Sequence, residues 1–164
     1  MKSALIITAA IILGACATAT GPESGPTAES SPISLASADP SAPQGLQPLV
    51  NASLPSSECG MVLWTLEGTR PAAVFQFITG KAARVKIAGR ELNLTLTEFS
   101  GASGYGVFER QRFAGEEGLV VEVTAQFGLE FAGGAYLEQG LIRVRDGAGW
   151  SMVSPTAGIA GCRN

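Results

Sequence analysis

Residues 91–98 carry the strictest alternation of apolar and polar side chains in the chain. Three leucines alternate there with three polar residues: Leu92, Leu94, Leu96, Asn93, Thr95 and Thr97. Because neighbouring residues of a β-strand point to opposite faces of the sheet, this pattern predicts a strand with its leucines in the core. A helix would need an apolar period near 3.6, which this segment lacks.

Similar short segments recur along the chain, separated by residues that favour turns. We expect about eight strands, over residues 60–66, 72–78, 82–88, 91–98, 105–110, 119–127, 135–145 and 150–153. Between them we expect a small-residue loop at 99–104 and a glycine-containing loop at 128–134. Short strands at regular spacing, with little convincing helix, indicate an all-β fold that is either a small antiparallel barrel or a sandwich.

The composition is uneven and divides the chain into three parts. Residues 58–164 form a block long enough to bury a core, and we assign the globular domain to them. Residues 16–57 are rich in Ser, Pro, Ala, Thr and Gly and contain no aromatic residue, which predicts a disordered tether. Within the tether, residues 46–54 are less polar, and this stretch is apolar enough to lie along the domain.

The first fifteen residues form a secretory signal pattern. Lys2 precedes an apolar run over residues 4–13, which is too short for a transmembrane helix of about 20 residues. The run ends in Leu13-Gly14-Ala15-Cys16, which resembles the lipobox of bacterial lipoproteins. That resemblance implies a signal peptide over residues 1–15, cleavage before Cys16 and a lipid anchor on its thiol. Ala17 after the Cys implies, by the same resemblance, an outer-membrane protein facing the periplasm.

With Cys16 assigned to the lipid, Cys59 and Cys162 remain, one near each end of the domain. An exported protein enters an oxidising compartment, where such a pair usually forms a disulfide. The alternative is a metal pair, but two cysteines in a chain without histidine make a poor zinc site. An eight-stranded barrel would place its two terminal strands side by side, which fits a Cys59–Cys162 bridge.

Composition also argues against several functions. Without histidine there is no Ser-His-Asp or Cys-His catalytic site, and no glycine pattern for phosphate opens a helix. The domain holds ten basic and eleven acidic residues without a basic stripe, so nucleic-acid binding has no electrostatic support. We therefore expect a non-enzymatic binding or structural role without a cofactor or metal, the partner being an envelope protein or a glycan. A carbohydrate-acting enzyme built on two glutamates stays an alternative.

The segment from Phe99 to Tyr105 is a candidate binding loop, because its small residues allow another surface to approach closely. With the stretch 83–92 before it, this Ser-Gly segment followed by Tyr resembles the periplasmic and membrane-bound inhibitors of c-type lysozyme. Those proteins are small barrels with a disulfide. The resemblance implies that Ser100, next to Gly101, is the hydroxyl inserted into the lysozyme cleft and that Tyr105 anchors the loop. Lysozyme inhibition is thus a second functional hypothesis.

Two arginines follow this segment. Arg110 and Arg112, with Phe108 and Phe113 beside them, are of the residue types found in interaction surfaces. They fit equally well as outward residues of a strand whose aromatic neighbours belong to the core. Ser100, Gly101, Tyr105, Arg110 and Arg112 together form the predicted binding region.

Overall fold

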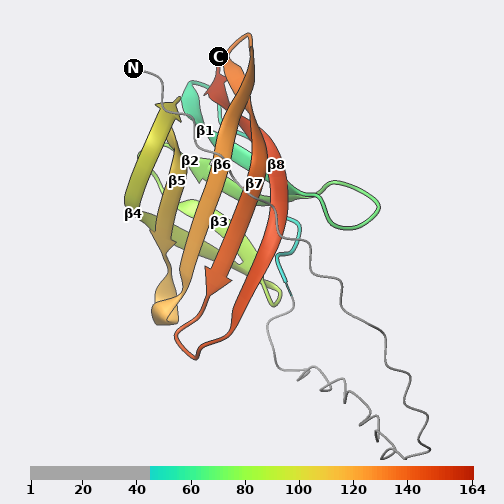
Figure 1. Ribbon diagram of the computed structural model, residues 1–164, viewed down its shortest axis with the longest axis vertical. Coiled ribbons are helices and arrows are strands. Elements are labelled where there is room, and N and C mark those ends of the chain that lie inside the picture. Colours follow the sequence, from blue (N-terminus) through green and yellow to red (C-terminus); the bar gives the residue numbers. More distant parts are fainter. Residues whose placement is uncertain (1–44) are drawn as a thin grey trace, which may run out of the picture. The chain divides into compact units, whose positions relative to one another are not determined.

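The computed structural model describes residues 45–164. They form a closed barrel of eight antiparallel strands, each paired with the next along the chain (Figure 1). The strands are β1 (Glu58–Thr65), β2 (Ala73–Ile78), β3 (Ala83–Ile87), β4 (Arg90–Gly104), β5 (Val107–Ala114), β6 (Val120–Phe131), β7 (Gly134–Arg145) and β8 (Ser151–Arg163). The predicted all-β fold is confirmed. Because the sheet is closed, the fold is the barrel and not the sandwich.

The only helical element among the described residues is the short 3₁₀ turn η1 (Glu116–Gly118). No helix in this part of the chain has the length and apolar character needed to cross a membrane. The predicted signal peptide, Cys16 and most of the predicted tether lie outside the described residues.

The barrel closes where β1 pairs with β8, from Glu58 opposite Arg163 to Thr65 opposite Thr156. Cys59 and Cys162 are direct partners in this ladder, with their Cα atoms 3.9 Å apart, and they form a disulfide. The predicted bridge is therefore confirmed. It joins β1 to β8, which are neighbours in the barrel although no turn of the chain connects them directly.

Alternate residues of the strands fill the barrel interior. Phe113 lies between Phe75 and Phe77, with ring centroids 5.2 and 5.3 Å apart in edge-to-face geometry. Leu94 is fully buried, and Leu92 and Leu96 pack against the same core, as the alternation predicted. Burial of this continuous apolar interior is the main favourable term in the stability of the fold.

Two predicted loops are wrong, because strands occupy their residues. The segment 99–104 belongs to β4, and the chain turns only at Tyr105 and Gly106. The segment 128–134 is likewise divided between β6 and β7, with a turn at residues 132–133. Hydrogen bonds from neighbouring strands hold both segments extended in spite of their glycines, which have low strand propensity. The last strand also continues well beyond residue 153 for the same reason, since β8 is paired with both β1 and β7.

Residues 45–57 lie along the barrel, and we call them the strap. Leu46 bridges to Ile87 of β3, and the N–H of Leu49 donates to the carbonyl of Ala73 at 2.8 Å. Leu54 is only 8% exposed. Folded structure thus begins at least a dozen residues before β1. It includes residues 46–54, the less polar stretch that was expected to lie along the domain.

Candidate binding surface on strands β4 to β7

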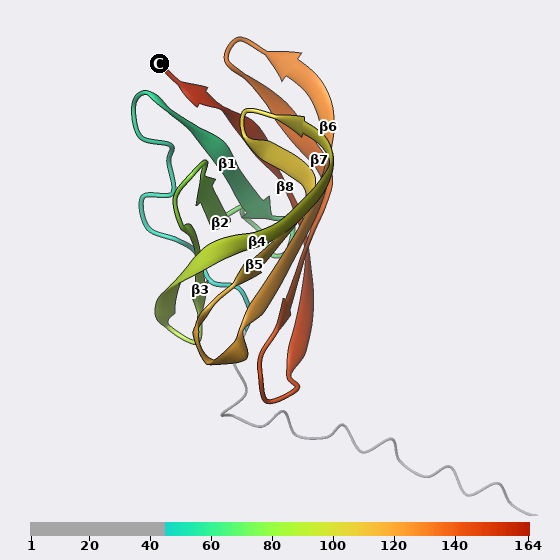
Figure 2. The same cartoon turned by 90° about the vertical axis from the view of Figure 1, so that its left-hand side faces the viewer.

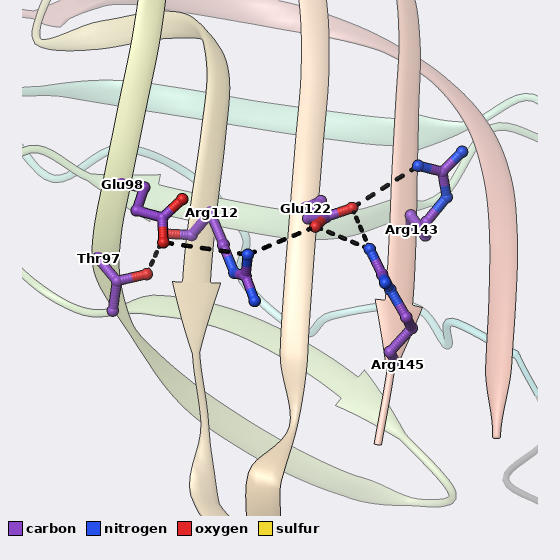
Figure 3. Close-up of polar contacts among 6 residues, drawn as sticks. All are labelled: Thr97, Glu98, Arg112, Glu122, Arg143 and Arg145. Carbon is purple, nitrogen blue, oxygen red and sulfur yellow. Dashed lines mark hydrogen bonds and ion pairs between the residues drawn. The ribbon is translucent and has the colours of Figure 1, made fainter. Parts of the chain in front are cut away.

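A row of alternating charges crosses four neighbouring strands. Glu98 of β4 is paired in register with Arg112 of β5, Arg112 with Glu122 of β6, and Glu122 with Arg143 of β7 (Figure 3). The adjacent residues along β5, β6 and β7 belong to the core: Phe113, Val121, Val123 and Val144. Alternation therefore places the charged row on the outer surface of the barrel.

Glu122 is the centre of this row. Both of its carboxylate oxygens accept from one terminal nitrogen of Arg145, at 2.8 Å each. Arg143 lies 3.6 Å away and Arg112 lies 4.0 Å away, measured between nitrogen and carboxylate oxygen. The hydrogen bond from Arg145 is the main reason that the pKa of Glu122 lies below its ordinary value, with smaller contributions from the charges of all three arginines. One carboxylate thus faces three guanidinium groups, which leaves an excess of positive charge.

A second row runs parallel to the first. Ser100 of β4 is paired with Arg110 of β5, and Arg110 with Thr124 of β6. The Nε of Arg110 donates to the Ser100 hydroxyl at 3.1 Å. Within residues 45–164, Arg110 forms no ion pair, and its side chain is exposed. Its guanidinium therefore keeps donors that are available to an anion.

A shallow groove of about 410 Å³ lies between these two rows. It is lined by Glu98, Phe99, Ser100, Arg110, Gln111, Arg112, Glu122, Val123 and Thr124. Phe99 is 58% exposed, and its ring stacks on that of Phe108 with centroids 4.3 Å apart. Arginine together with exposed aromatic rings is the composition typical of protein–protein interfaces. We call the groove with its two rows the arginine face.

The structure brings together three of the five residues predicted to bind: Ser100, Arg110 and Arg112 all line the groove. Gly101 and Tyr105 are not among the lining residues. Gly101 lies at a β-bulge, where the N–H of the next residue donates to the carboxylate of Glu109 at 3.2 Å. Tyr105 forms the β4–β5 turn, and its carbonyl accepts from the Thr79 hydroxyl at 3.0 Å. Ser100 therefore lies within a strand and not at a protruding loop tip.

Sequence reasoning missed four members of this surface: Glu98, Glu122, Arg143 and Arg145. The spacing of Arg143 and Arg145 is a usable signal, because two arginines two residues apart in a strand point to the same side. Only the strand register, however, shows that they lie opposite Glu122. That register depends on a bulge between Leu137 and Gly140 and another after Thr124, which no local pattern marks.

The carboxylates of this surface are poorly suited to acid catalysis. A general acid for glycoside cleavage needs a raised pKa, whereas the pKa of Glu122 is lowered. Glu98, the other carboxylate in the groove, lies 3.9 Å from Arg112. In the described part of the chain, no three His, Cys, Asp or Glu side chains are placed to hold a metal ion.

Comparisons with models of protein families, with curated proteins and with solved structures found no match. Function is therefore inferred from the chemistry of the surface itself. Its main features are the exposed Arg110 and Arg112 at the groove, the further arginines Arg143 and Arg145 that pair with Glu122, and the exposed ring of Phe99.

Proposed function

We propose that the protein is a lipid-anchored, non-enzymatic binding protein of the cell envelope. Cys16 carries the anchor, which holds the barrel at the outer membrane on the periplasmic side. The lipobox-like segment Leu13-Gly14-Ala15-Cys16 supports the anchor, and the disulfide between Cys59 and Cys162 fits an oxidising compartment. On this proposal the barrel binds an acidic segment of another envelope protein through its arginine face.

The observation that carries the proposal is Arg110, an exposed guanidinium at the edge of a groove and without an ion pair in residues 45–164. Arg112 adds to it, because its two ion pairs are long, at 3.9 and 4.0 Å. A carboxylate of a partner can form a bidentate pair with such a group, which is stronger than a neutral hydrogen bond. The stacked Phe99 and Phe108 next to the groove favour a peptide over a free ion, since aromatic side chains are enriched in protein interfaces.

The binding proposal is tested with the full lipidated protein, crosslinked in envelope extract and recovered with its partners. We compare the wild type with Arg110→Gln and with Arg70→Gln, a matched loss of one charge on the exposed β1–β2 loop. We expect one dominant protein partner with the wild type and the control variant. Recovery should fall about tenfold with Arg110→Gln and should weaken with added salt.

Equal recovery with both variants would contradict a role for the arginine face. Recovery of glycan without protein would refute the acidic peptide as the occupant.

The anchor is tested separately by replacing the proposed lipidated residue. Cys16→Ser should abolish incorporation of labelled palmitate, because only a thiol forms the thioether to the lipid. Cys59→Ser with Cys162→Ser is the control, since it removes the other two cysteines, which form the disulfide, without touching the proposed anchor. Labelling that persists in Cys16→Ser would contradict the proposal.

Inhibition of c-type lysozyme stays a second candidate, because the exposed Ser100 side chain lines the groove. Its position inside β4 is less suited to insertion into a cleft than a loop tip would be. Inhibition by the wild type that is lost in Ser100→Ala, with partner recovery from the envelope unchanged, would favour the inhibitor over the binding protein proposed above.

A further inference from the structure

A second cavity lies at the end of the barrel where three turns meet. These turns are β3–β4 at residues 88–89, β5–β6 at residues 115–119 and β7–β8 at residues 146–150, and Figure 2 shows them gathered at one end. The cavity has a volume of about 380 Å³. Its apolar side chains come from four different segments: Ile87, Leu92, Leu119 and Trp150. We call it the mouth cavity.

The mouth cavity is continuous with the core but does not run through the barrel. Ile87 and Leu119 belong to the core cluster, and Leu92 and Trp150 pack against that cluster. Farther in, the interior is filled by side chains that include Phe75, Phe77 and Phe113. The cavity is therefore an apolar cup that opens to solvent. Cups of this volume in the mouths of barrels are common sites for small ligands.

The rim of the cup is held in place by hydrogen bonds. A carboxylate oxygen of Asp146 accepts from the N–H of Ala148 at 3.0 Å and from that of Trp150 at 2.8 Å. In the facing turn, the N–H of Leu119 donates to the carbonyl of Glu116 at 3.0 Å. The two turns also touch, because a Cβ at Gly147 would lie 2.8 Å from a carbonyl oxygen of the facing turn. A preformed rim lowers the entropy cost of binding.

The charges around the rim indicate the polar group of the ligand. Three carboxylates line the cavity, those of Glu116, Glu117 and Asp146, against one cation, Arg90. Arg90 lies 3.8 Å from Glu117, so Glu116 and Asp146 supply an uncompensated negative charge. An apolar cup with an acidic rim is complementary to a molecule that has an apolar body and a cationic head.

We infer that the mouth cavity binds cationic amphiphiles, with the apolar body against Leu92, Leu119 and Trp150 and the cationic head between Glu116 and Asp146. This site lies at the barrel end and is lined by none of the residues of the arginine face. The two binding activities are therefore separable by mutation.

Trp150 provides a direct readout, because the chain has only one other tryptophan, Trp64. We use the full chain with Cys16→Ser, so that no attached acyl chain competes, and with Trp64→Phe. Decyltrimethylammonium and decyl sulfate are titrated below their micelle concentrations, and circular dichroism checks that the fold persists. We expect a saturable blue shift of the Trp150 emission with decyltrimethylammonium, at an affinity about fivefold higher than for decyl sulfate.

Two variants test the location and the charge. Ala148→Phe fills the cup from the exposed rim and should weaken binding of decyltrimethylammonium about tenfold or more. Glu116→Gln with Glu117→Gln should remove the preference for the cationic probe, whereas Glu130→Gln, an exposed glutamate in β6 outside the cavity, should not. A linear, unsaturable response, or equal affinity in Ala148→Phe, would overturn the site. Equal or tighter binding of decyl sulfate by the parent would overturn its charge preference.

Discussion

At the scale of single residues, the arginine face depends on Glu122. Its side chain is 25% exposed, and it pairs with three arginines that would otherwise repel one another. A charged network of this kind contributes more than an isolated surface pair, because one partner is already largely removed from water and its geometry is set by the strands.

We predict that Glu122→Gln lowers the free energy of unfolding by about 1 kcal/mol at neutral pH. The matched control is Glu98→Gln, whose carboxylate has only a 3.9 Å ion pair and a 70% exposed side chain. That control should change stability by less than about 0.5 kcal/mol. Urea denaturation of the three proteins measures both differences, and equal effects of the two substitutions would contradict a special role for Glu122.

The pH dependence follows from the lowered pKa of Glu122. Because the folded state holds the carboxylate charged more strongly than the unfolded state does, its contribution is fully present above the ordinary value of 4.5. It is lost as the pH falls through the lowered pKa of the folded protein. The stability difference between wild type and Glu122→Gln should therefore shrink below pH 4.5 and stay constant between pH 6 and 8. A difference that grows on acidification would have the wrong sign.

At the scale of elements, the β4–β5 hairpin shows what local patterns leave open. The alternation of Leu92, Leu94 and Leu96 correctly predicted the first half of β4 and its inward face. The second half was predicted to be a loop, because Gly, Ala and Ser have low strand propensity. It is a strand because β5 hydrogen-bonds along it through two bulges, and the position of those bulges depends on the partner strand.

The turn of this hairpin contains a position that only glycine fits. Gly106 has φ +75°, and a Cβ there would overlap the side chain of Thr79, whose hydroxyl donates to the neighbouring carbonyl of Tyr105. Gly80 has the same φ but open space around it. We predict that Gly80→Ala costs about 1 kcal/mol through backbone strain alone, and that Gly106→Ala costs about 1–3 kcal/mol more through the overlap. Thermal denaturation measures both, and similar losses would show that the contact with Thr79 is unimportant.

At the scale of the whole molecule, the disulfide reinforces barrel closure. It spans a sequence separation of 103 residues and joins β1 to β8. We predict that Cys59→Ala with Cys162→Ala lowers the free energy of unfolding by about 4–5 kcal/mol, since a long loop gains much entropy when the cross-link is removed from the unfolded chain. Guanidinium denaturation with and without a reductant checks this. The reductant should lower the free energy of unfolding of the wild type and leave that of the double variant unchanged. An equal free energy of unfolding of the wild type with and without the reductant, which reaches the disulfide in the unfolded chain, would contradict the prediction.

Much of the global architecture was predictable from the sequence, and little of the surface was. The all-β class, the number of strands and the bridge follow from alternation, turn residues and two cysteines, all of which are short-range or countable features. The choice between a barrel and a sandwich does not follow from them, because closure depends on the pairing of β1 with β8. The arginine face is different, because it combines Glu98, Arg112, Glu122 and Arg143 from four strands. Such a row exists only after every register has been set, and registers are set by packing and bulges across the whole sheet.

The most direct test of the proposed binding function places a photoreactive amino acid at Thr124 in the full lipidated protein inside living cells. Thr124 lines the groove, whereas Asn93, the matched control site, is an exposed residue of β4 paired with β3 and lies outside the groove. If the arginine face binds an envelope protein, the photoreactive residue at Thr124 crosslinks to one dominant protein. That crosslink is lost with Arg110→Gln, and the photoreactive residue at Asn93 does not form it. No adduct at Thr124, or the same adduct from both sites regardless of Arg110, would contradict the proposed function.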